Sequence, residues 1–108
     1  YTNPEAAFVG MSEEQAKASG KPYKVKKVSI NFSGRHVAEN GLSNGLCKLI
    51  VDTEKNTLIG AALMSSYASE YIYSLALMID LQVPVERILR TVFPHPTVCE
   101  VIRETLMS

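Results

Sequence analysis

The stretch FPHPTVCE, residues 93–100, brings together residue types that could move a proton. His95 stands between Pro94 and Pro96, and Glu100 follows five residues later. The two prolines fix φ on either side of the histidine and push the residue between them out of the α region. The backbone therefore aims the imidazole in one direction. We interpret His95 as a candidate acid or base and Glu100 as its candidate partner.

Two readings of Glu100 follow from its spacing. A carboxylate bonded to one imidazole nitrogen fixes the tautomer and leaves the other nitrogen able to exchange a proton, for example with a thiol. Side chains on a helix lean toward its N-terminus, so Glu100 in a first turn could reach back toward His95. Alternatively, Thr97 and Glu100 form a T-x-x-E capping box that only begins the last helix. Spacing alone favours this structural reading.

The other side chains that could take part in chemistry have no partner residue at a useful spacing. Cys99 lies four residues after His95, but inside a helix we expect it to pack as a small apolar residue. Cys47 is expected to lie in a strand with its side chain in the hydrophobic core, and His36 is expected to lie in a polar loop. Glu70 is interpreted as a first-turn charge that favours the helix dipole. A role for Glu70 at a subunit contact stays open.

Local patterns predict the elements that must position these residues. Ser12 and Gln15 form a capping box that begins a helix ending at Gly20. Ser66 is the expected N-cap of a long helix, and a bulge is expected near Lys26 and Lys27. The expected elements are a strand at 6–10, a helix at 12–20, a strand at 23–32, a hairpin with strands at 46–52 and 57–66, and helices at 66–82, 83–92 and 97–108. Consecutive strands without βαβ alternation predict an α+β fold, a small antiparallel sheet with helices packed on one side.

The helix at 66–82 is apolar nearly all round. A three-stranded sheet covers only one side of such a helix, so its other face needs an absent domain, a second copy of the chain, or the short helices of this same domain. The residues alone leave the choice among these three open. Leu75 is placed on this second face, so Leu75→Glu is expected to break the dimer if a second copy covers it.

Composition sets further bounds. The apolar fraction is 46%, and eleven basic residues balance eleven acidic ones, so no electrostatic footprint for nucleic acid or an anionic membrane is present. The two cysteines form neither a disulfide framework nor a metal-ligand spacing, which favours a reducing, cytoplasmic setting and no metal site. No apolar run is long enough to span a bilayer. The chain begins without Met and with a strand-like segment, so we expect residues 1–108 to be a single domain of a longer protein.

Four segments together carry a resemblance. Taken in order, YTNPEAAFVGMSEEQAKASG, GLCKLIVDTEKNTLIGA, ASEYIYSLALMI and PHPTVCEVIRETL resemble the C-terminal interface domain of the pyridine nucleotide–disulfide oxidoreductases, and within them the dihydrolipoyl dehydrogenases. The resemblance covers essentially the whole chain except the loop around Arg35. The chain departs from the usual pattern at Phe93 and Pro94, at Ser66 and Tyr67, and at Cys99, where a small hydroxyl residue is common.

The resemblance implies a function that needs more than this chain. FAD and nicotinamide domains, binding FAD and NAD(P), precede the interface domain in such enzymes, and a redox disulfide lies against the flavin. The enzyme is a homodimer in which His95, with Glu100, would serve the partner subunit's disulfide during exchange with a dithiol such as dihydrolipoamide. The backbone of Pro94 and His95 would lie beside the partner's flavin.

The fragment by itself is expected to be inactive. It contains neither a GxGxxG fingerprint nor a closely spaced cysteine pair, so it cannot carry hydride or electrons alone. The alternative is a non-catalytic homodimerisation or interaction module, which the zero net charge and the apolar helix would suit equally well.

Overall fold

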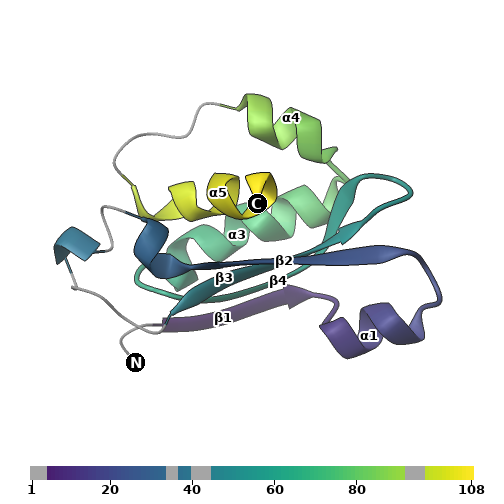
Figure 1. The fold of residues 1–108 in the computed structure, drawn as a ribbon, viewed down its shortest axis with the longest axis horizontal. Helices are drawn as coiled ribbons and strands as arrows, with labels where there is room; N and C mark the ends of the chain where they lie inside the picture. Colours follow the sequence, from purple (N-terminus) through teal and green to yellow (C-terminus); the bar gives the residue numbers. More distant parts are fainter. Residues whose placement is uncertain (1–4, 34–36, 40–44, 92–96) are drawn as a thin grey trace.

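The computed structural model of the chain describes residues 5–33, 37–39, 45–91 and 97–108, which form two layers (Figure 1). One layer is a four-stranded antiparallel sheet of order β1-β4-β3-β2, and the other consists of the helices that follow the last strand, on one face of that sheet. The helix between the first two strands lies on the other side of the sheet, where Glu13 pairs with Lys48 at 2.9 Å. The strands are β1 (Glu5–Gly10), β2 (Tyr23–Ser29), β3 (Leu46–Asp52) and β4 (Thr57–Ser65). The helices are α1 (Glu13–Ala18), α3 (Ala68–Asp80), α4 (Val85–Arg90) and α5 (Val101–Met107), with 3₁₀ turns η1 (Ile30–Phe32) and η2 (Val98–Glu100). The predicted α+β class is confirmed.

Strand β1 enlarges the sheet beyond the three strands expected around the long helix. It pairs with β4 from Glu5 opposite Ser65 to Gly10 opposite Gly60. The two glycines let the two strands approach closely, because a Cβ on Gly10, whose φ is +71°, would lie 2.4 Å from the carbonyl oxygen of Ile59. Helix α3 packs across β1 and β4, whereas α5 packs across β2 and β3.

The bulge predicted near Lys26 and Lys27 is wrong. Strand β2 pairs with β3 in one unbroken register, from Tyr23 opposite Asp52 to Ser29 opposite Leu46. The physical reason is that Lys26 lies on the helix side of the sheet, where its Nζ donates to the carbonyl oxygen of Leu106 at 2.8 Å. A cation at the end of α5 satisfies a carbonyl that lacks a helical partner. Regular alternation therefore places Val25 on the opposite face.

The predicted β3–β4 hairpin is confirmed, and Asp52 holds its turn. Its Oδ1 accepts hydrogen bonds from the backbone N–H groups of Glu54 at 2.9 Å and Lys55 at 3.0 Å. These backbone bonds, the bond from Lys55 above all, lower the pKa of the Asp52 carboxyl. Because the folded pKa is lowered, this stabilisation is present above the ordinary carboxyl pKa and is lost as the pH falls through the lowered one.

Helix α3 begins differently from the prediction, because Ser66 is not its N-cap. The N-cap residue is Tyr67, whose φ of 59° lies in the left-handed region that side chains rarely adopt. The cap comes instead from β1, since Glu5 Oε1 accepts from both the backbone N–H of Ser69 at 3.2 Å and its Oγ at 3.0 Å. This carboxylate also complements the positive end of the helix dipole.

The two faces of α3 have different environments. Tyr71 and Leu75 are buried against the sheet, and Leu75 is 0% exposed. On the opposite face Tyr73, Leu77 and Leu81 are 67%, 42% and 68% exposed. The placement of Leu75 on a dimer face is therefore wrong, because the sheet of its own domain covers it.

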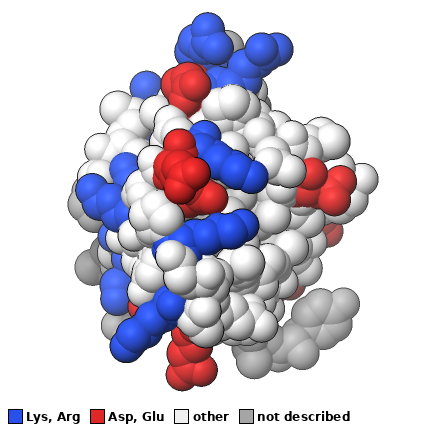
Figure 2. Space-filling view, turned by 90° about the vertical axis from the view of Figure 1, so that its right-hand side faces the viewer, with Lys and Arg blue, Asp and Glu red and all other residues white. Residues whose placement is uncertain are grey.

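The remaining described elements close the helical layer. Helix α4 follows Pro84, which pairs with Thr57 as an isolated bridge, and its Val85 and Ile88 are buried. Basic and acidic side chains are interspersed on the face drawn in Figure 2. Within the described part of the chain, no helix combines the length and the apolarity that crossing a membrane requires.

Replacing Leu75 with Ala tests the packing of α3. We expect a loss of about 2–5 kcal/mol in the free energy of unfolding, because a fully buried leucine leaves a cavity. The matched change Phe8→Ala should cost under about 0.5 kcal/mol, because Phe8 is 74% exposed. Urea denaturation at one protein concentration measures both. Equal costs for the two variants would contradict the assignment of faces.

Candidate functional site

The structure describes part of the site predicted from the sequence. Glu100 ends the 3₁₀ turn η2 and leads directly into α5. His95, Pro94 and His36 lie outside the described residues. The contact between His95 and Glu100 therefore stays a prediction.

The Thr97–Glu100 capping box is confirmed. The backbone N–H of Thr97 donates to Glu100 Oε1 at 2.7 Å, and the reciprocal bond of the box is also present. This bond anchors the carboxylate at the end of the chain segment that contains His95. The structural reading of Glu100 is thus correct, and a second role through the same carboxylate is compatible with it, because a carboxylate has about four acceptor sites.

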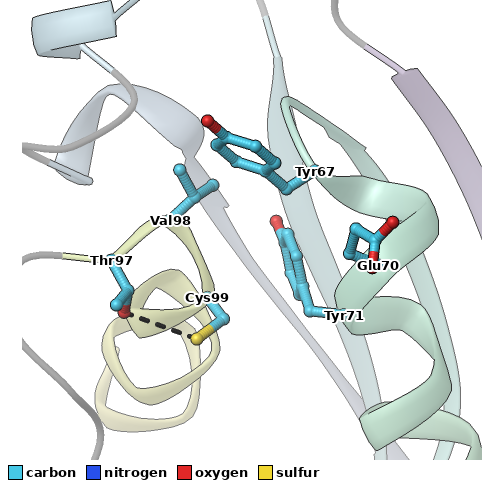
Figure 3. Close-up of a pocket in the computed structure, with 6 residues that line it drawn as sticks. All are labelled: Tyr67, Glu70, Tyr71, Thr97, Val98 and Cys99. Carbon is cyan, nitrogen blue, oxygen red and sulfur yellow. Dashed lines mark hydrogen bonds between the residues drawn. The ribbon is translucent and has the colours of Figure 1, made fainter.

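A cavity of about 260 Å³ lies beside this turn, between the start of α3 and η2 (Figure 3). It is broadly open to solvent. Its walls are almost entirely apolar, and they come from two segments far apart in the sequence. The lining residues are Tyr67, Glu70 and Tyr71 from the first segment and Thr97, Val98 and Cys99 from the second.

Hydrogen bonds fix the two tyrosines in the wall. The Ser65 hydroxyl donates to the carbonyl oxygen of Ser66 at 2.6 Å, so the phenol of Tyr71 is the donor in its 2.6 Å bond to Ser65 Oγ. Burial raises the pKa of the Tyr71 phenol, which stays neutral. Tyr67 donates to Glu39 Oε1. Tyr67 lines the cavity from a left-handed backbone conformation, for which the sequence carries no signal.

The two cysteines differ in access. Cys47 is fully buried, and burial raises the pKa of its thiol to about 11, so it is not ionised near neutral pH. The interpretation of Cys47 as a core residue is confirmed. Cys99 is half-buried, packs against the core from η2, and its Sγ lies 3.4 Å from Thr97 Oγ1. Cys99 therefore lines the cavity, a position that helical spacing alone did not indicate.

An apolar stripe on α3 continues from the cavity. We define it as Tyr73, Leu77 and Leu81, with Glu70 as its polar N-terminal end; all four are exposed, and Leu81 is the C-cap residue of the helix. At 100° per residue these positions fall within about 80° of the helix circumference. Glu70 lies in the first turn of α3, as predicted. Tyr73 was not predicted as a surface residue from the sequence, although its spacing of four from Leu77 was the available signal.

Neither a group of metal ligands nor a parallel βαβ unit occurs among the described residues. Among them, no three His, Cys, Asp or Glu side chains are grouped so that they could hold a metal. The sheet is antiparallel throughout. It therefore lacks the parallel βαβ units at whose strand ends dinucleotides bind.

Comparison with known proteins matches the chain to a family of dimerisation domains. The family model described as "Pyridine nucleotide-disulphide oxidoreductase, dimerisation domain" matches residues 1–106. A dihydrolipoyl dehydrogenase of Rhizobium etli is 33% identical over 108 residues, which are 100% of this chain and 22% of that protein. A dihydrolipoyl dehydrogenase of Buchnera aphidicola is 40% identical over 102 residues, 94% of this chain and 21% of that protein.

The fold of the chain is also similar to that of a solved structure. The HOCl-induced flavoprotein disulfide reductase of Escherichia coli superposes with a TM-score of 0.91 at 28% identity, over 97% of this chain and 24% of that one. The chain thus spans about one fifth of the length of the curated relatives it matches. The resemblance noted from the four sequence segments is confirmed.

Two variants of Glu100 measure its capping role in this chain. Glu100→Gln should leave the free energy of unfolding nearly unchanged, because Gln also completes a capping box. Glu100→Ala should lower it by about 0.5–2 kcal/mol, the usual cost of losing a cap. Thermal or urea unfolding followed by circular dichroism compares the two. A Gln variant as unstable as the Ala variant would show that the box does not hold this turn.

Proposed function

We propose, since this chain belongs to the family of pyridine nucleotide–disulphide oxidoreductase dimerisation domains, that it forms the C-terminal domain of a longer disulfide oxidoreductase similar to dihydrolipoyl dehydrogenase. Residues 1–108 would constitute that domain, with FAD and nicotinamide domains before it. The length of the relatives, about five times that of the chain, supports this arrangement. The flavin supplies electron transfer between a dithiol and the nicotinamide when it is bound elsewhere in the enzyme.

We further propose that His95 and Glu100 act in thiol–disulfide exchange on the partner subunit. A substrate such as dihydrolipoamide attacks one sulfur of the redox disulfide, which forms a mixed disulfide and releases the other sulfur as a thiolate. His95 accepts the proton of the attacking thiol and returns it in the reverse direction. Glu100 is the positioning residue that orients the imidazole.

One observation carries the acid/base proposal. The Thr97 N–H bond to Glu100 Oε1 anchors the carboxylate at the mouth of the last helical segment, immediately after the residues that contain His95. Side chains in a first turn lean toward the N-terminus, which is the direction of His95. A carboxylate already held by the backbone loses little further freedom when it binds an imidazole.

The homodimer is proposed to form through the apolar stripe of α3. Tyr73, Leu77 and Leu81 are large and exposed, and a two-fold interface brings the same patch of both copies together. The isolated chain would dimerise but bind neither FAD nor NAD(P), and would be inactive alone.

Removing the imidazole tests the catalytic role. In the full enzyme, His95→Gln should slow disulfide exchange with dihydrolipoamide by about two to four orders of magnitude, the usual range for lost general acid–base catalysis. Glu100→Gln should lower turnover less and shift its pH profile. Reduction of the flavin by NAD(P)H should change little in either variant, which makes it the internal control. Near-normal dihydrolipoamide turnover in His95→Gln would contradict the proposal.

A charge in the stripe tests the dimer. Leu77→Glu should raise the dimer dissociation constant of the isolated chain about 100-fold or more, because two carboxylates would be buried without partners. Phe8→Glu is the matched control, since Phe8 is exposed on the opposite side of the sheet from α3. Sedimentation across a concentration series measures both. If Phe8→Glu splits the dimer and Leu77→Glu does not, the dimer surface lies on the sheet instead.

A further inference from the structure

The cavity between α3 and η2 is large enough to accept a side chain from another molecule. Its volume of about 260 Å³ exceeds the roughly 150 Å³ that accommodates a six-carbon ring in an apolar protein cavity. Its lining is almost wholly apolar, with Glu70 at the exposed edge. Water gains few hydrogen bonds in such a space, so an apolar side chain suits it better.

The stripe of α3 leads to the cavity. Glu70 belongs to both, and Tyr73, Leu77 and Leu81 follow on the same face. The distance from Glu70 to Leu81 along the helix is about 16 Å. Cavity and stripe therefore form one continuous surface, with a hollow at the N-terminal end and a projecting leucine at the C-terminal end.

A two-fold axis makes such a surface complementary to itself. If position i of one copy contacts position j of the other, then j contacts i as well. An antiparallel arrangement, in which the two α3 helices overlap along the whole stripe, covers Leu81 and the hollow at once. A crossing near Tyr73 alone would leave Leu81, which is 68% exposed, in water.

We propose that in the dimer the Leu81 side chain of each copy fills the cavity of the other copy, against Tyr67, Val98 and Cys99. The inference rests on the proposed dimer through α3. It adds a specific occupant for the cavity, and it implies that dimerisation covers the Cys99 thiol next to the turn that carries Glu100. Each dimer would contain two such contacts, one in each cavity. Subunit association would therefore stabilise the η2 turn of both copies.

Cys99 is a native reporter for this contact. The sequence has two cysteines, and Cys47 is fully buried whereas Cys99 is not. Alkylation of the 108-residue chain with N-ethylmaleimide, followed by peptide mass spectrometry, gives a separate rate for each thiol. The rate at Cys47 reports unfolding and serves as the internal control.

The rate should depend on association. Across a dilution series that sedimentation shows to pass from dimer to monomer, the alkylation rate of Cys99 should be at least about tenfold lower in the dimer, because thiol reactivity follows access. Leu81→Ala, assayed at a concentration where sedimentation shows the variant to be dimeric, should restore the faster rate. Phe8→Ala, an exposed apolar truncation on the sheet, should not.

Each other outcome overturns the inference in a distinct way. If the dimer forms and Cys99 reacts as fast as in the monomer, the cavity is not an interface contact, and the acid/base proposal for His95 is untouched. If Cys99 is protected in the dimer but Leu81→Ala leaves it protected, a different side chain fills the cavity. If the chain is monomeric at every concentration, a second copy is not the occupant.

Discussion

The packing of α3 against the sheet is the constraint on which the other features depend. Leu75 and Tyr71 are buried on its inner face. A helix has one rotational setting once its inner face is buried, so the same packing turns Tyr73 and Leu77 toward solvent. It also brings the first turn of α3 opposite η2, which creates the cavity. Core packing thereby determines both the surface available to a second copy and the surroundings of Glu100.

Polar anchors set the axial position of that helix. Glu5 reaches from β1 to the first turn through Ser69, and Tyr71 is tied to the end of β4 through Ser65. A helix dipole alone would not place the helix along the strands, whereas two bonds to neighbouring strands do. The left-handed Tyr67 between them costs conformational energy, of order 1–2 kcal/mol. This strain is sustained because the flanking strand and helix are fixed on both sides.

The features predicted correctly from the sequence depend on residues close together in the chain. The capping box of Thr97 and Glu100 spans three residues, and the β3–β4 turn is likewise local. The errors involve partners distant in sequence. Glu5 caps a helix 64 residues away, and Lys26 binds a carbonyl 80 residues away, so neither the true cap nor the regular strand could be inferred locally. Because α3 is apolar nearly all round, the spacing of its apolar residues did not indicate which face the sheet would bury.

The central claim is that one face of α3 packs against the sheet while the opposite face contacts a second copy. The most direct test is an isotope-filtered nuclear Overhauser experiment on mixed dimers of labelled and unlabelled chain. Such a spectrum records only proton pairs that lie close together across the subunit boundary. If the exposed face of α3 forms the dimer contact, intermolecular signals will come from the methyl groups of Leu77 and Leu81 and from the ring of Tyr73, with none from Leu75. Intermolecular contacts from Phe8 and Met64 on the outer face of the sheet, with none from the stripe, would contradict it.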